Sequence, residues 1–105
     1  MNKIFREQQR LQDVMNNPMG KGEEAIKNNI FAMAVEGVEV LDEINWKPWK
    51  KQRKRVDPQK VHEELVDCLQ FLVNAMIASG MSANDVNRII ERKWEINHRR
   101  VKDGY

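Results

Sequence analysis

Two segments of the sequence combine an apolar helical pattern with closely spaced carboxylates, and this combination restricts the folds that the chain can adopt. In AVEGVEVLDEI, Glu36 and Glu39 interrupt an apolar run, and in VHEELVDCLQF, Glu64 and Asp67 have the same spacing. At about 100° per residue, helical positions i and i+3 lie about 60° apart, so each pair can reach one point. Because burying several carboxylates is costly without a cation, the pairs predict either a shared metal site or solvated acids on a bundle surface.

Three turn-forming segments, NNPMGKG, WKPWKKQRKRVDP and SGMS, divide the chain into four stretches with helical periodicity. None of the four shows the alternation that is typical of strands. The pattern predicts helices over about residues 2–16, 23–45, 58–79 and 82–102. We therefore expect one all-α domain over residues 1–105, folded as a short four-helix bundle.

Two of the predicted helices have clear start signals. Asp57 followed by Pro58 is typical of an N-cap and the first position of a helix. Ser82 with Asp85 three residues later has the spacing of a capping box. These signals place the first residues of the third and fourth helices.

The second predicted helix is apolar on two faces. Phe31, Val35 and Val38 share one face, which differs from the face formed by Ile26, Ile30, Met33 and Leu41. A helix with two apolar faces is buried on both sides, and a chain of 105 residues has few other helices to cover it. We therefore expect a homo-oligomer, either a dimer or a tetramer, with site residues from more than one subunit.

Charge is distributed unevenly along the chain. The net charge is +2, but residues 47–55 hold six basic residues and no acid. This segment is either a solvated loop or a strip that binds a small polyanion. Because no nucleic-acid recognition motif accompanies it, we do not expect nucleic acid as the partner.

The N-terminus MNKIFREQQR is too polar for a signal peptide, and no apolar run approaches the ~20 residues that span a bilayer. The single cysteine, Cys68, excludes an internal disulfide. These features predict a cytoplasmic protein without a membrane partner.

The inward face of the fourth helix changes from apolar to polar halfway along. Val86 and Ile90 are followed on this face by Lys93, Asn97 and Arg100. Either this end of the helix emerges into solvent, where basic residues favour the helix dipole, or the three side chains bind phosphate beside the acids.

A cage of carboxylate oxygens suits Mg²⁺, and Mn²⁺ is a second possibility. His62 lies off the acidic face, so zinc is not expected. Trp46 and Trp49 are suited either to packing or to stacking on a base.

Taken together, these motifs resemble the all-α nucleoside triphosphate pyrophosphohydrolases, a superfamily that includes MazG-like enzymes and dimeric dUTPases. The resemblance rests on the two acid pairs, on WKPWK (46–50), on KWEINHRRVKDGY (93–105) and on QQRLQ (8–12). It covers nearly the whole chain, and the dimeric dUTPases are the more similar branch.

The resemblance implies an oligomeric bundle of the MazG and dimeric dUTPase type that hydrolyses dUTP to dUMP and pyrophosphate. It implies that Mg²⁺ is held by Glu36, Glu39, Glu64 and Asp67. One of these acids would accept the proton from the attacking water, and Glu39 is the first candidate. The substrate-binding residues that the resemblance implies are Gln8, Gln12, Trp46 and Lys50 for the base and lid, and Lys93, Asn97, Arg100 and Tyr105 for the phosphates.

Two departures leave the substrate open. Gln12 stands where the family carries asparagine, and the chain is shorter than a typical dimeric dUTPase. A broader MazG-like activity on dCTP or other nucleotides is therefore an alternative. An alternative of another class is a non-enzymatic helical dimer that binds nucleic acid through residues 47–55.

Overall fold

The computed structural model describes residues 1–104, and within that range it contains four α-helices and no strand. The helices are α1 (Asn2–Val14), α2 (Gly22–Asp42), α3 (Pro58–Ala78) and α4 (Ala83–Lys102). The all-α prediction is confirmed. The predicted first helix is two residues too long, because Asn16 and Asn17 adopt left-handed backbone conformations that end it.

Both predicted start signals are present. The side chain of Asp57 accepts a hydrogen bond from the backbone N–H of Gln59, at 3.0 Å, and Pro58 occupies the first position of α3. Ser82 and Asp85 form a reciprocal capping box at the start of α4. Local sequence alone therefore accounts for where these two helices begin.

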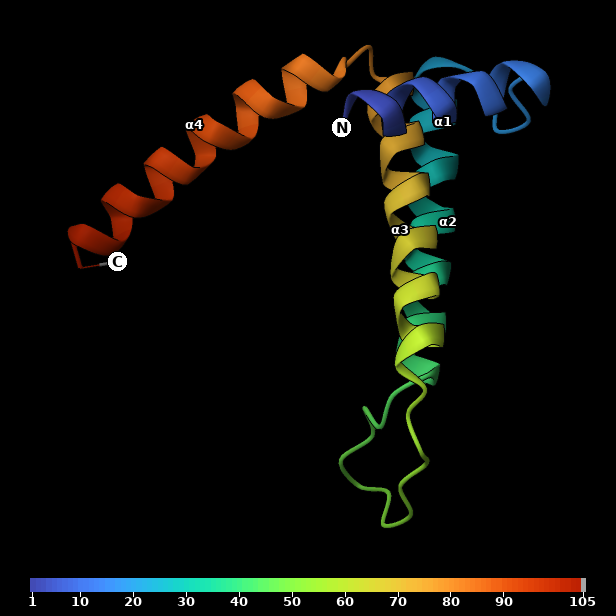
Figure 1. Cartoon of the computed structure of the whole chain (residues 1–105), viewed down its shortest axis with the longest axis vertical. Coiled ribbons are helices and arrows are strands. Elements are labelled where there is room, and N and C mark those ends of the chain that lie inside the picture. The colour runs from blue at the N-terminus through green and yellow to red at the C-terminus, as the bar shows by residue number, and fades with distance from the viewer. Residues whose placement is uncertain (105) are drawn as a thin grey trace.

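The helices α2 and α3 form an antiparallel pair, and α1 crosses the end of that pair where α2 begins and α3 ends (Figure 1). At the opposite end of the pair, a long loop joins α2 to α3. The small core lies at the crossing, where Phe5, Val73 and Ala83 are buried together. Ile4, Met76, Ile77 and Val86 pack against this cluster.

The last helix does not lie along the others. The chain turns by 105° between α3 and α4, and only the first turn of α4 contacts the core (Figure 1). The radius of gyration is 17.2 Å, whereas a compact domain of about 100 residues has a value of about 13 Å. The four helices therefore do not form a closed bundle within one chain, in contrast to the expectation from sequence.

Within the described part of the chain, none of the helices by itself has the length and apolar character needed to cross a membrane. Only α3 and α4 taken together, as a bent pair, meet the length and composition criteria.

Candidate metal and nucleotide site

The four predicted metal ligands lie at one place between α2 and α3. Glu36 and Glu39 project from α2, and Glu64 and Asp67 project from α3, which runs antiparallel beside it. Carboxylate oxygens of Glu36, Glu64 and Asp67 lie within 4.8 Å of one another. These three side chains are half-buried, whereas Glu39 is exposed beside them. We call this group of four the carboxylate cluster.

Crowding in the carboxylate cluster favours protonated carboxyl groups. The pKa of Glu36 is raised from 4.5 to about 7, first by a hydrogen bond with Glu39, then by burial and by the negative charges of Glu39 and Asp67. The pKa of Glu64 is also raised, mainly by burial. The neighbouring Cys68 thiol has a raised pKa for the same reasons, burial first and then the nearby acids. Without a cation, repulsion among the ionised carboxylates therefore destabilises the folded state.

Two oxygens of the carboxylate cluster lack hydrogen-bond partners. Glu36 Oε2 and Glu64 Oε2 are both buried, and neither accepts a hydrogen bond from any described residue. A divalent cation with a preference for oxygen ligands would satisfy both atoms and cancel the repulsion. Mg²⁺ and Mn²⁺ therefore fit the residues present, and a metal that prefers nitrogen or sulfur does not.

The raised pKa of Glu36 predicts an unusual pH dependence of stability in the metal-free protein. Between 4.5 and about 7 the folded state binds more protons than the unfolded chain, so the free energy of unfolding should decrease as pH rises through this window. Thermal unfolding in EDTA at a series of pH values should show this decrease. Added Mg²⁺ should raise the melting temperature most at the upper end of the range.

The variant Glu36→Gln is the control, since it should flatten the pH dependence in EDTA and weaken the response to Mg²⁺. A melting temperature that rises with pH in EDTA across this window would contradict the assignment.

The predicted phosphate-binding residues lie away from the carboxylate cluster of the same chain. Lys93, Asn97 and Arg100 are exposed on α4, which projects away from α2 and α3 (Figure 1). Tyr105 lies outside the described residues. One chain by itself therefore does not bring these three side chains to its own acids.

The predicted base-binding residues fall into two separate groups. Gln8 and Gln12 are on α1 at one end of the α2–α3 pair, whereas Trp46 and Lys50 are in the loop at the other end (Figure 1). A helix of 21 residues is about 30 Å long, so Gln12 and Trp46 of one chain cannot contact the same base. Within one chain these residues therefore lie apart, and a base pocket with contributions from α1 and this loop stays a prediction that concerns residues of different subunits.

Gln8 is engaged in the fold itself. Its Nε2 donates to Asn74 Oδ1 at 2.8 Å and lies 3.5 Å from the backbone oxygen of Gln70, and its Oε1 accepts from Gln70 Nε2 at 3.4 Å. The side chain is only 7% exposed. These hydrogen bonds attach α1 to α3, so a direct role at a base would compete with them.

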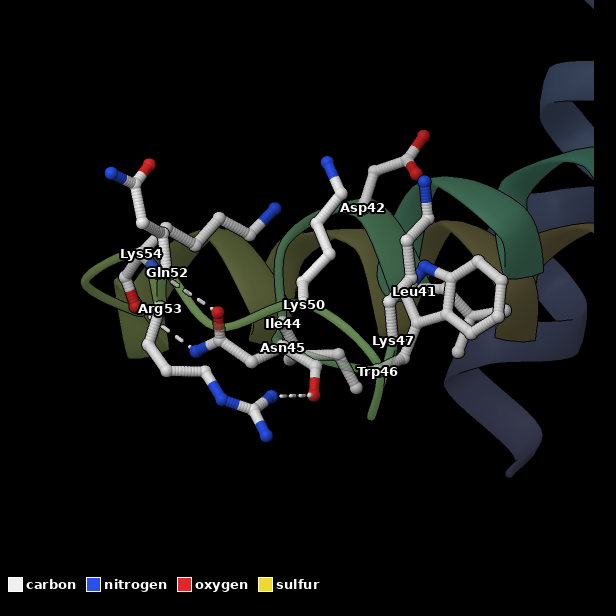
Figure 2. A pocket seen from close by; sticks show the side chains of 10 residues that line it. All are labelled: Leu41, Asp42, Ile44, Asn45, Trp46, Lys47, Lys50, Gln52, Arg53 and Lys54. Atoms are coloured by element: carbon white, nitrogen blue, oxygen red, sulfur yellow. Dashed lines mark hydrogen bonds between the residues drawn. The ribbon is translucent and has the colours of Figure 1, made fainter.

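The loop around Trp46 borders a half-open cavity of about 340 Å³ (Figure 2). Asn45 holds the loop together, because its side chain donates to Lys54 O at 3.0 Å and accepts from Lys54 N at 2.9 Å. The Trp46 ring meets Trp49 edge to face at 5.7 Å, and Lys47 Nζ lies 5.5 Å from the Trp46 ring centre. The basic side chains that line this cavity are Lys47, Lys50, Arg53 and Lys54. The cavity is suited to an anion with an aromatic group.

Two buried amides, Asn29 and Asn74, belong to none of the sequence motifs. Asn29 and Asn74 are 2% and 8% exposed, and both line a second cavity next to α1. A signal was present in the sequence, because each asparagine interrupts an apolar stretch, KNNIFAMAV and FLVNAMIA. Buried amides need partners, so such positions indicate either a structural network or a ligand.

Comparison with known proteins places the carboxylate cluster in a family. A sequence profile of the dUTPase family matches residues 1–92. The match contains all four acids and ends before Lys93, Asn97 and Arg100. No solved structure shows significant similarity to the chain.

Two curated relatives from bacteriophages are similar over part of their length. The dCTP pyrophosphatase of Enterobacteria phage LZ5 is 32% identical over 71 residues, with 57% of this chain and 41% of the relative covered. The dCTP pyrophosphatase of Enterobacteria phage T4 is 31% identical over 71 residues, with 57% and 42% covered. The chain thus matches about two fifths of the length of these relatives. Because the profile match extends over most of the sequence and includes every residue of the carboxylate cluster, the chain belongs to the dUTPase family.

Proposed function

We propose that the chain is a Mg²⁺-dependent nucleoside triphosphate pyrophosphohydrolase that converts dUTP to dUMP and pyrophosphate. The observation that carries this proposal is the carboxylate cluster, with two buried oxygens that lack partners, in a member of the dUTPase family. The second candidate substrate is dCTP, which is favoured by the names of the two phage relatives.

Each acid has a role that follows from its position. Glu36, Glu64 and Asp67 converge and would hold the metal ion, with Glu39 beside them. The chemistry that Mg²⁺ supplies when bound is neutralisation of phosphate charge and activation of water. Glu39 is the most exposed of the four, so its carboxylate is accessible to a water molecule and accepts the proton during attack on the phosphate chain.

A pyrophosphate-release assay over the common dNTPs and NTPs, with Mg²⁺ or EDTA, tests the activity and ranks the bases. Release that requires Mg²⁺ and is fastest with dUTP would support the first candidate, and fastest release with dCTP would support the second. No metal-dependent release from any nucleotide would contradict the proposal and favour nucleic-acid binding through residues 47–55.

We further propose that α4 of a second copy covers the exposed face of α2 and α3. Phe31, Val35 and Val38 are 64%, 59% and 56% exposed along α2, so a stripe of large apolar side chains is uncovered in one chain. On α4, Ile90 and Trp94 are 39% and 54% exposed and form a second stripe. In a symmetric dimer, the α4 stripe of each chain can pack against the α2 stripe of the other chain, so that both stripes are covered.

Charge supports the same pairing. The helix α4 carries six basic and three acidic side chains, whereas α2 carries five acidic side chains and one lysine. At about 100° per residue, Lys93, Asn97 and Arg100 flank the apolar stripe of α4 on one side. Docking this stripe on a partner therefore presents the phosphate-binding residues to the partner's acidic surface, which accounts for their distance from the acids of their own chain.

Mixing two impaired variants is expected to restore activity. Glu39→Gln disables the acids of one subunit, and Lys93→Ala disables the phosphate contact of the other. If sites are shared between subunits, mixed oligomers contain some sites with neither change, and part of the pyrophosphate release should return. Turnover of the mixture should be compared with the sum of the separate variants.

Exchange of subunits must be shown in the same samples, for example by native mass spectrometry of differently tagged chains. Exchange without any recovery would place each site within one chain, and an active monomer by light scattering would contradict the shared site outright.

A further inference from the structure

The loop between α2 and α3 is folded although its charges oppose folding. Residues 47–55 hold six basic residues and no acid, and a segment of like charges repels itself and tends to extend. In the structure, four of these basic side chains nevertheless line the cavity at Trp46. An interaction within the loop must therefore hold its two ends together.

Asn45 supplies this interaction (Figure 2). Its Nδ2 donates to the backbone oxygen of Lys54 at 3.0 Å, and its Oδ1 accepts from the backbone N–H of Lys54 at 2.9 Å. The backbone oxygen of Asn45 also accepts from Arg53 Nη1 at 3.1 Å. These three hydrogen bonds join positions that are eight or nine residues apart, so residues 45–54 form a closed loop.

The side chain at position 45 must be an amide to make this closure. The carboxamide of asparagine carries a donor and an acceptor on one planar group, so it can pair with both backbone groups of a single residue. The N–H of Lys54 can only donate and its oxygen can only accept, which fixes the orientation of the Asn45 amide. Aspartate at this position would keep the acceptor and lose the donor, and alanine would lose both.

The segment that the closed loop contains is ordered by short-range contacts. The backbone N–H of Lys50 donates to the oxygen of Lys47 at 3.2 Å, which forms a turn. The rings of Trp46 and Trp49 meet edge to face, and Lys47 Nζ lies over the Trp46 ring. Because all these contacts lie between the two ends that Asn45 joins, closure limits the conformations that Trp46 and Lys50 can adopt.

The closed loop lies next to the carboxylate cluster. Leu41 and Asp42 line the cavity, and Glu39 precedes Asp42 by three residues, which is about 4.5 Å along an α-helix. Basic side chains at this distance act on an anion that is bound at the acids. The arrangement of the loop therefore affects how strongly such an anion is bound.

We infer that Asn45 is a positioning residue for the substrate. It closes the loop against the repulsion among the basic side chains and so keeps Trp46 and Lys50 in the arrangement that receives the anionic nucleotide. When a smaller fraction of the protein has the closed loop, the apparent affinity falls by that fraction. The inference rests on the proposed pyrophosphohydrolase activity for its substrate, whereas closure of the loop by Asn45 does not depend on that activity.

Limited digestion with trypsin measures closure directly. Trypsin cleaves after lysine and arginine, and residues 50–55 offer five such positions, whereas Lys47 is protected by Pro48. Cleavage follows the population of the open loop. Asn45→Ala loses two hydrogen bonds and should be cleaved within residues 50–55 about tenfold faster than the unchanged protein, with fragments identified by mass spectrometry. Asn45→Asp should be cleaved more slowly than Asn45→Ala, and equal rates for all three proteins would overturn the inference.

Pyrophosphate release separates positioning from a purely structural role. With whichever of dUTP and dCTP is cleaved faster, Asn45→Ala should raise KM by about threefold or more, and kcat should stay within about twofold because the carboxylate cluster is unchanged. Asn45→Asp should recover part of the change in KM. A residue that only stabilised the fold would lower the melting temperature and leave KM unchanged well below it, so an unchanged KM in Asn45→Ala would overturn the assignment.

The matched control is Asn28→Ala. Asn28 Nδ2 donates to the backbone oxygen of Met19 at 2.9 Å, so it also joins positions nine residues apart, but near the opposite end of α2. This variant should leave the cleavage rate within residues 50–55 unchanged. Cleavage there as fast as in Asn45→Ala would mean general loosening of the fold and would contradict a specific role of Asn45.

Failure of the proposed function would be recognised separately, as the absence of pyrophosphate release from every nucleotide. In that case inorganic triphosphate replaces the substrate as the probe. It should slow cleavage of the loop in the unchanged protein, and Asn45→Ala should need a higher concentration for the same protection. No protection of the unchanged protein, or equal protection of both proteins at the same concentrations, would overturn the positioning role.

Discussion

The variant Glu39→Gln is expected to fold as the unchanged protein does and to lose about 100-fold to 1,000-fold in kcat. Glutamine keeps the shape of the side chain but has neither the negative charge nor the ability to accept a proton. Metal binding and proton acceptance by this carboxylate together lower the activation free energy by several kcal/mol, and losing them corresponds to a decrease of this size. Pyrophosphate release under saturating dUTP and Mg²⁺ measures it. The melting temperature in EDTA should not decrease, because the change removes a charge that raises the pKa of Glu36.

The control for this experiment is Glu63→Gln on α3. Glu63 is exposed next to Glu64 in sequence, and it accepts a hydrogen bond from Gln59 Nε2 at 3.2 Å, outside the carboxylate cluster. It carries the same change of charge and should retain nearly full activity. Full activity of Glu39→Gln with Mg²⁺, or an equal loss in Glu63→Gln, would refute the assignment of the acids.

The variant Val35→Glu is expected to convert the oligomer to monomers and to abolish pyrophosphate release at low protein concentration. Val35 is 59% exposed in one chain and lies between Phe31 and Val38 on the uncovered stripe of α2. If α4 of a second copy covers this stripe, the new carboxylate must be buried without a partner, which is strongly unfavourable. Activity should fall although the carboxylate cluster of each chain is unchanged. Light scattering and turnover should be measured over the same range of protein concentrations.

Val14→Glu provides the same change outside the stripe. Val14 is the last residue of α1 and is 76% exposed, so a carboxylate there remains in water. This variant should keep both its oligomeric state and its activity. A Val35→Glu protein that remains oligomeric and active would contradict the proposed interface, since nothing would then cover this face of α2.

Much of the local structure was predictable from sequence because the interactions that produce it span few residues. The cap of α3 depends on Asp57 and Pro58, and the capping box of α4 on Ser82 and Asp85, all within one turn of their helices. The spacing of Glu36 with Glu39 and of Glu64 with Asp67 likewise places each pair on one helix face. Since α2 and α3 are joined in sequence and pack as neighbours, the two pairs also meet in space, as the sequence indicated.

Properties that depend on the angles between helices were not accessible in this way. A helical pattern identifies which face is apolar, but the direction of α4 depends on the turn at residues 79–82 and on the contacts of Ala83 and Val86 with the core. That direction separates Lys93 and Arg100 from the acids of their own chain. In the same way, the packing of α1 across the end of α3 engages Gln8 with Asn74 and separates Gln12 from Trp46. These outcomes depend on contacts between residues far apart in sequence, whereas helix periodicity reports only on neighbours three or four positions away.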